Sequence, residues 1–351
     1  MYDAEGRLDL KSLTREELER WFVEGLGEKR FRALQVYKWI WQRGISDFAE
    51  MTNVSKDLRA LLAERAYLCT LSERLVQRSS DGTAKYLWGL EDGYAVESVL
   101  IPEEDRITLC VSSQVGCAMG CRFCLTGDMG LVRHLKPSEI VNQVAQINAE
   151  LPEDRRITNL VFMGMGEPLH NLEHLDTSLQ ILLDDDALNF SHRKITVSTS
   201  GLVPQIGKLA ERTPVNLAIS LNASTEAQRR EIMPITERYS MASVIEAARN
   251  YPLGSGKRIT FEYVMFKDFN DSLEDAARLY RLLRGIKAKV NLIPYNENPS
   301  RDYRKPDAQT VKAFQNYFVS RGLNCSVRST RGDDISAACG QLGREASGVG
   351  G

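Results

Sequence analysis

The chain has 351 residues, and its 45 Lys and Arg side chains nearly balance 47 Asp and Glu side chains, which leaves a formal net charge of −2. Hydrophobic residues make up 43% and charged residues 26%, as in ordinary globular proteins. Because typical nucleic-acid binders are basic, any contact with RNA would need local basic patches. The sequence has no apolar run of about eighteen residues or more and no signal-peptide pattern, so we expect a cytoplasmic protein without a membrane partner.

Residues 1–70 are predicted to form a small helical domain. Thr14 and Glu17 have the spacing of a capping box at the start of a helix. Between residues 29 and 43, basic side chains are interleaved with an apolar stripe, which fits either an RNA-binding surface or an ordinary solvated face. The expected stripe contains Phe31, Leu34, Ile40 and Trp41, and the basic residues are Lys29, Arg30, Arg32, Lys38 and Arg43.

Residues 71–102 change to a strand pattern. Asp81-Gly82 and Asp92-Gly93 are dipeptides typical of tight turns, and strand-like runs lie beside them. This segment is therefore predicted to be a short antiparallel extension that links the helical domain to the main domain.

Residues 103–335 alternate strand-like runs with helical patterns, which predicts an α/β fold with a parallel sheet. About six units fit into this length, fewer than a closed eight-unit barrel needs, so we expect an open, partial β/α barrel. Ligand sites of such sheets lie at the C-terminal ends of the strands. Residues 336–351 are expected to form a C-terminal tail that carries Cys339. The predicted strands cover residues 107–113, 159–163, 194–199, 215–221, 258–265, 289–294 and 323–328.

Three cysteines follow the first of these strands with the spacing Cys117-x3-Cys121-x2-Cys124. Three thiolates on one tight loop can hold three corners of an iron–sulfur cubane and leave the fourth iron open for a ligand. A structural zinc site would need a fourth close ligand, and the nearest histidine, His134, is ten residues away. The spacing therefore favours a 4Fe–4S cluster, and it resembles that of the radical SAM superfamily, whose members cleave S-adenosylmethionine (SAM) at the open iron.

A second motif follows the next strand, where the sequence reads Val161-Phe-Met-Gly-Met-Gly166-Glu167-Pro168. Glycines let the backbone approach a ligand closely, and a carboxylate can bind an ammonium group. A glycine-rich turn is common by itself. Beside the cysteine motif, it resembles the Gly-Glu segment with which this superfamily binds the amino group of SAM.

Over nearly its whole length, the chain resembles the radical SAM adenine methyltransferases of 23S ribosomal RNA. Two of the similar segments contain cysteines that the superfamily at large does not need, Cys110 and Cys339. The similar segments are residues 108–117, 162–169, 195–201, 217–222, 232–235 and 332–342.

The resemblance implies a reaction with one cluster and two SAM molecules per turnover. Cys339 is first methylated, and its methyl carbon is later joined to the adenine through a radical. Cys110 then resolves the covalent protein–RNA link and forms a disulfide with Cys339, and Glu97 matches the position of the proton acceptor. The SAM contacts implied by position are Gly166, Glu167, Ser198, Ser220, Leu221, Asn222 and Asn296. Many relatives carry histidine where this chain has Asn222.

The resemblance also implies that C2 of an adenosine in the peptidyl-transferase centre is methylated, together with an adenosine beside the tRNA anticodon. The implied partners are 23S rRNA, tRNA and a reducing electron donor such as flavodoxin, with a monomer as the default state. The nearest alternative is the C8-methylating relative that confers antibiotic resistance on ribosomes. Two further alternatives are an activase that installs a glycyl radical on a partner protein and a cluster- or zinc-containing RNA-binding protein.

Overall fold

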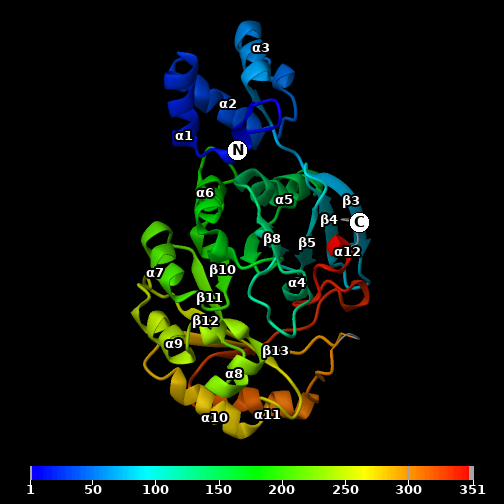
Figure 1. The fold of residues 1–351 in the computed structure, drawn as a ribbon, viewed down its shortest axis with the longest axis vertical. Coiled ribbons are helices and arrows are strands. Elements are labelled where there is room, and N and C mark those ends of the chain that lie inside the picture. Colours follow the sequence, from blue (N-terminus) through cyan, green and yellow to red (C-terminus); the bar gives the residue numbers. More distant parts are fainter. Residues whose placement is uncertain (1, 299–300, 348–351) are drawn as a thin grey trace.

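The N-terminal part of the chain is a small helical module at one end of the molecule (Figure 1). The structure is a computed structural model that describes residues 2–298 and 301–347; the last four residues of the expected tail lie outside this part. The capping box at Thr14 is present and begins the first helix. The elements of the module are β1 (Leu8–Asp9), η1 (Leu10–Ser12), α1 (Arg15–Arg20), η2 (Trp21–Gly25), α2 (Arg30–Gln42), η3 (Phe48–Glu50), α3 (Lys56–Arg65) and β2 (Ala66–Tyr67).

The apolar side of α2 packs into the module, but the predicted stripe is wrong at one position. Ile40 and Trp41 are buried, as are Val36 and Tyr37, whereas Phe31 is 55% exposed. Phe31 lies in the first turn of α2, on the side that faces solvent. An exposed aromatic side chain of this size is the opposite of what the stripe predicted.

Buried hydrogen bonds attach the module to α5 (Pro137–Glu150) of the main domain. Lys11 Nζ donates to Asn142 Oδ1 at 3.2 Å, and Asn142 Nδ2 donates to the Cys69 carbonyl at 2.8 Å. Gln146 binds both backbone groups of Leu71, at 2.8 and 2.9 Å. Polar side chains of α5 therefore hold one part of this connection, and ion pairs of Arg15 and Lys38 with Asp184 and Asp186 hold another.

Within the described residues, ten strands form one mixed sheet in the order β14-β13-β12-β11-β10-β9-β6-β5-β4-β3. The expected antiparallel extension is its edge: β3 (Ser72–Arg78), β4 (Ala84–Gly89) and β5 (Ala95–Pro102). The turns between them contain Gly82 and Gly93, whose φ angles of 85° and 89° lie in the left-handed region that favours glycine.

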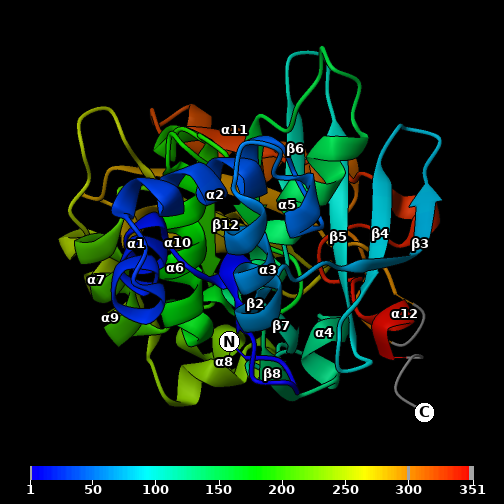
Figure 2. The same ribbon diagram turned by 90° about the horizontal axis from the view of Figure 1, so that it is seen from above.

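Seven strands of this sheet are parallel, and six crossovers join them in the part of the chain that the structure describes. The sheet ends at β14 instead of closing, which confirms the open α/β barrel. At its other end, β5, β4 and β3 lie side by side (Figure 2). The parallel strands are β6 (Ile107–Cys110), β9 (Asn159–Phe162), β10 (Ile195–Thr199), β11 (Asn216–Ser220), β12 (Ile259–Met265), β13 (Ala288–Pro294) and β14 (Cys325–Val327). Besides α5, the crossover helices are α6 (Leu172–Leu183), α7 (Val203–Arg212), α8 (Glu226–Ile232), α9 (Met241–Asn250), α10 (Leu273–Leu282) and α11 (Ala308–Val319).

Two irregular segments complete the C-terminal edge of the barrel. After β6, a hairpin of β7 (Gln114–Gly116) and β8 (Leu131–His134) encloses the cysteine loop and α4 (Leu125–Asp128). After β14, the chain passes through η7 (Asp333–Ile335), and α12 (Arg344–Ser347) packs against β5. None of the described helices is long and apolar enough to cross a membrane.

Candidate active site

Backbone hydrogen bonds hold the three-cysteine loop against three neighbouring segments. The Cys117 N–H donates to the Gly130 carbonyl at 2.8 Å, which fixes the loop to its hairpin. Arg122 N–H donates to the carbonyl at the end of α8 at 3.0 Å, and Leu125 N–H donates to the Gly340 carbonyl at 2.9 Å. A Cβ on Gly127 would lie 3.1 Å from the Cys121 carbonyl oxygen, so this turn leaves little room for a side chain.

Burial raises the pKa of the Cys117 thiol to about 12 and also raises the pKa of Cys121 and Cys124. Neutral thiols are expected in such a site without a cation, and bound iron would favour the thiolates. Among the described residues, no three His, Cys, Asp or Glu side chains are arranged around a single metal ion. In a cubane cluster each thiolate binds a different iron, so the donor set of three cysteines on one loop fits such a cluster.

The Gly-Glu turn after β9 is locked against β7 and β10. Gly166 has φ +99°, and a Cβ there would lie 2.5 Å from Cβ of Gln114, so no side chain fits. Glu167 N–H donates to Gln114 Oε1 at 2.7 Å. The buried Glu167 carboxylate accepts from Ser200 N–H at 2.7 Å and Leu169 N–H at 3.2 Å. Burial raises the pKa of this carboxyl group, and the bonds from Ser200 oppose that shift.

The other predicted SAM contacts also lie at or just after C-terminal strand ends, as the barrel rule requires. Ser198 is near the end of β10, Ser220 ends β11, and Leu221 follows it. Asn222 has φ 59°, and its Oδ1 accepts from Val264 N–H at 3.0 Å, so this side chain already holds β12 in place. Asn296 follows β13 and donates to the Cys339 carbonyl at 3.2 Å.

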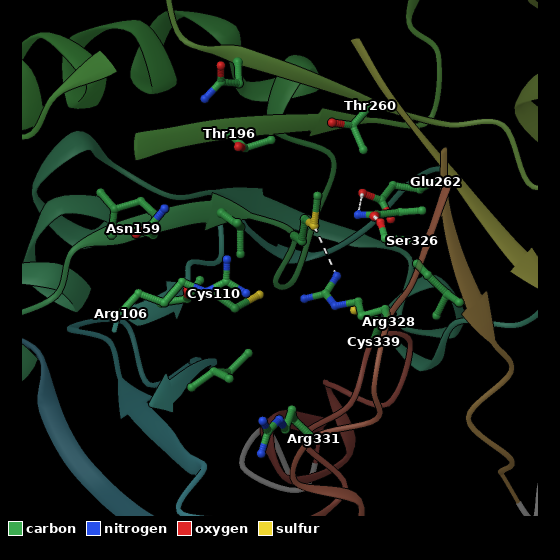
Figure 3. Close-up of a pocket in the computed structure, with 18 of the residues that line it drawn as sticks. Arg106, Cys110, Asn159, Thr196, Thr260, Glu262, Ser326, Arg328, Arg331 and Cys339 are labelled. Carbon is green, nitrogen blue, oxygen red and sulfur yellow. Dashed lines mark hydrogen bonds between the residues drawn. The ribbon is translucent and has the colours of Figure 1, made fainter. Parts of the chain in front are cut away.

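Cys110 and Cys339 line one cavity of about 950 Å³ on the inner side of the barrel (Figure 3). Cys110 ends β6 and is buried; burial and the nearby Cys339 thiol raise its pKa to about 12. Cys339 is half-buried in the turn before Gly340, and both cysteines are free thiols. The implied disulfide is therefore not formed in this structure. The fold therefore brings Cys110 and Cys339, which lie more than 200 positions apart in the sequence, to the same cavity.

Glu97 is fully buried on β5, under the C-terminal segment. Its Oε2 accepts from Gly343 N–H at 3.0 Å, and its Oε1 has no partner among the described residues. Burial and, after it, a hydrogen bond with Glu345 raise the pKa of Glu97 to about 7. Lys85 Nζ lies 2.7 Å from Glu345 Oε2 and completes this buried cluster. Glu97 shares a strand face with Val99, which lines the cavity, but it is not itself among the lining residues.

Sequence reasoning missed three polar residues of this region. Gln114 connects the cysteine hairpin with Glu167, and Glu262 and Arg328 line the cavity. The half-buried side chain of Arg328 extends toward the barrel interior. The available signal for Glu262 was a single acidic residue in the largely apolar strand Ile259–Met265.

An open parallel barrel with a three-cysteine loop at its C-terminal edge defines a radical SAM enzyme. Residues 111–280 match the radical SAM superfamily, and residues 8–68 match the ribosomal RNA large subunit methyltransferase N-terminal domain. A crystal structure of a radical SAM methyltransferase from Sphaerobacter thermophilus superposes with a TM-score of 0.90 at 43% identity, covering 95% of this chain and 99% of that one.

Curated relatives give the same result over nearly the full length. The chain is 56% identical to a dual-specificity RNA methyltransferase RlmN of Anaeromyxobacter sp. (strain Fw109-5), covering 97% of this chain and 92% of that protein. It is 52% identical to the protein of that name from Geobacter sulfurreducens, covering 95% and 92%. The chain therefore belongs to the family of radical SAM dual-specificity RNA methyltransferases, and the resemblance seen in the sequence is confirmed.

Proposed function

We propose that this chain methylates C2 of an adenosine in the peptidyl-transferase centre of 23S rRNA and an adenosine beside the tRNA anticodon. The observation that carries the proposal is that Cys110 and Cys339 line one cavity next to the cysteine loop. A radical SAM enzyme that uses only its cluster would not need these two additional thiols. The family membership supports RNA as the substrate class.

Cys117, Cys121 and Cys124 would hold one 4Fe–4S cluster, and SAM would be bound at the strand ends described above. Once bound, the cluster and SAM supply reductive cleavage of SAM, and with it radical chemistry that adds carbon to an electron-poor ring position. Glu167 is placed to receive an ammonium group, since its buried carboxylate is oriented by N–H groups of Ser200 and Leu169 at the C-terminal strand ends. Two SAM molecules per turnover follow from the separate need to methylate Cys339.

The remaining steps belong to protein residues. Cys339 carries the methyl carbon as a thioether and delivers it to the base. Cys110 attacks the Cys339 sulfur, so that a disulfide forms while the carbon–sulfur bond to the base breaks; the carbon keeps the bonding pair and takes a proton to become the methyl group, and the odd electron left by the radical addition would return to the bound cluster. Glu97 accepts the proton from the ring carbon, for which a pKa of about 7 is suitable. Because Gly343 and Glu345 cover Glu97, the segment after Cys339 has to shift before the carboxylate reaches the base.

The other partners follow from this chemistry. A target base has to leave its stack to enter the cavity, as other base-modifying enzymes require. We propose that residues 1–70 form the RNA-binding accessory domain, 71–102 the strand linker, 103–335 the catalytic barrel and 336–351 the tail that delivers Cys339. The enzyme would act as a monomer in the cytoplasm, where its RNA substrates are, with a donor such as flavodoxin.

Nucleoside mass spectrometry tests the proposal directly. Anaerobically reconstituted enzyme is given SAM with a CD3 methyl group, together with unmodified 23S rRNA and tRNA in parallel. We expect 2-methyladenosine that retains two deuterium atoms, because one is abstracted from the carried methyl group. A Cys339→Ala variant should bind the same amount of iron and form no methylated base. Formation of 8-methyladenosine would overturn the C2 assignment, and product from Cys339→Ala would overturn the carrier role.

A further inference from the structure

The cavity wall beneath the SAM-contact residues is a row of polar side chains across neighbouring strands. Residues two apart on a strand point to the same face, so Thr196 lies below Ser198 on the inside of the barrel. In the sheet register, Ser220 of β11 pairs with Glu262 of β12, which pairs with Asn291 of β13, which pairs with Ser326 of β14. The last three residues of this row line the cavity.

Glu262 presents an unsatisfied acceptor to this cavity. The residue is 4% exposed, and its Oε1 accepts from Asn291 Nδ2 at 3.1 Å. Asn291 Oδ1 in turn accepts from the Ser326 hydroxyl, so the carboxylate is oriented by a short chain of hydrogen bonds (Figure 3). Oε2 has no partner among the described residues. A buried carboxylate oxygen that lacks a donor is costly, so a ligand in the cavity that offers an N–H donor would be favoured at this position.

Arg328 supplies donors on the same wall. Its backbone N–H is fixed to the Leu292 carbonyl at 2.8 Å, and Nη1 lies 3.6 Å from the Met163 sulfur. In the described part of the chain, no carboxylate oxygen lies within 4 Å of its guanidinium group. Figure 3 shows this guanidinium beside Cys339 and across from Glu262. The cavity therefore combines one free acceptor with several free donors next to the methyl-carrying cysteine.

We propose that Glu262 and Arg328 recognise the base in the cavity as adenine: Glu262 Oε2 accepts from the exocyclic 6-amino group, and Arg328 donates to a ring nitrogen. The inference rests on the proposed function and assigns the groups that select its substrate. Guanine would place a carbonyl oxygen against the carboxylate and would be repelled. Asn291 is then a positioning residue, because it holds the other carboxylate oxygen.

SAM is a less suitable occupant of this part of the cavity. Of the seven residues expected to contact SAM, only Asn296 lines it. Both Cys110 and Cys339, which must meet the base, do line it. A volume of about 950 Å³ also leaves ample space for a flipped nucleoside.

The test compares two synthetic anticodon stem–loops, one with adenosine and one with purine riboside, which lacks the 6-amino group, at the target position. For each enzyme, the ratio of kcat/KM for the two RNAs is measured; the ratio is independent of the active fraction. Wild type should prefer adenosine by about tenfold or more, since a hydrogen bond to a charged group is at stake. Glu262→Met should lower this preference by about tenfold, and Glu262→Gln, which keeps an acceptor oxygen, should recover part of it.

Thr260→Val is the matched control, because Thr260 lies on the same strand face two residues away and also lines the cavity. Its ratio should equal that of wild type. Methylation of Cys339, read by peptide mass, should be the same in all variants. If Glu262→Met has the same ratio of kcat/KM for the two RNAs as wild type, the inference is overturned. This also holds if the variant differs from wild type only by a higher KM for SAM. If wild type methylates Cys339 but neither RNA, the proposed function itself fails, and the inference with it.

Discussion

At the scale of single residues, Glu97 shows how burial turns an ordinary side chain into a candidate base. The sequence places it in a strand where it could equally face solvent, and only the family pattern singles it out. The structure buries it beside Glu345, and both effects favour its protonated form, with a pKa of about 7. A carboxyl group with this pKa changes charge in the range where the enzyme has to work.

We therefore predict a pH dependence for the transfer of carbon to RNA. A raised pKa means that the base form is scarce below pH 7, so the single-turnover rate should rise through about pH 7 and level off above pH 8. Methylation of Cys339, which does not use Glu97, should lack this step. In Glu97→Gln the transfer to RNA should fall by at least about a hundredfold, as for loss of a general base.

The raised pKa of Glu97 also determines how the stability of the fold changes with pH. Because the folded state favours the protonated form of Glu97, stability is lost as pH rises through its folded pKa of about 7. The urea midpoint of the apoprotein should decline from about pH 5 to about pH 7, between the ordinary pKa of 4.5 and the folded value, and then level off, and the decline should be smaller in Glu97→Gln. If the two proteins show the same decline, Glu97 does not titrate in this range.

At the scale of elements, the strand-like runs and the glycine-rich turn could be read from the sequence, because local periodicity and residue type determine them. All seven predicted parallel strands occur, within a few residues of the expected bounds. The contact between the Gly166 turn and Gln114 could not be read, because it depends on how closely β9 and β7 approach. Sequence patterns give the type of an element, whereas such distances arise only from packing.

Gly166→Ala tests this close approach. With φ +99° and a Cβ 2.5 Å from Gln114 Cβ, the variant should lose more than about 1 kcal/mol of unfolding free energy and bind SAM more weakly. Gly207→Ala is the control, because Gly207 lies within α7 with no atom within 4 Å of an added Cβ. It should gain roughly 0.5–1 kcal/mol, as alanine does in a helix. Urea unfolding of the apoproteins measures the change in unfolding free energy for each of the two variants. Equal midpoints for Gly166→Ala and wild type would contradict the steric argument.

At the scale of the whole molecule, the open barrel and the helical module were predictable, whereas the return of the C-terminal segment to β5 was not. Gly343 binds Glu97 across 246 positions of sequence, and Lys85 pairs with Glu345 across 260. No periodicity or motif in the sequence indicates such a pairing, because the pairing depends on where the chain lies after it leaves the barrel at β14. The polar cavity wall was hidden for the same reason: Glu262, Asn291 and Ser326 become neighbours only through sheet register.

The helical module also presents a candidate surface for the RNA contact proposed for residues 1–70. Phe31 is 55% exposed at the start of α2, and the Arg32 guanidinium lies 4.8 Å from its ring centroid. An exposed aromatic ring beside a cation is a suitable platform for an unpaired base, since stacking of one base contributes about 1–3 kcal/mol. Lys29 and Arg43 are exposed at the two ends of the same helix and could contact phosphates.

We predict that Phe31→Ala weakens RNA binding by about tenfold without changing Cys339 methylation or the urea midpoint. Leu273→Ala is the matched control, because Leu273 is also 55% exposed but lies at the start of α10, at the opposite end of the molecule (Figure 1). Binding of a labelled tRNA, measured at several salt concentrations, separates stacking from phosphate contacts: Phe31→Ala should leave the salt slope unchanged, whereas Lys29→Ala should reduce it by about one. Equal affinities of Phe31→Ala and Leu273→Ala would mean that RNA does not reach this face, and the accessory role of the module would then have to rest on another surface.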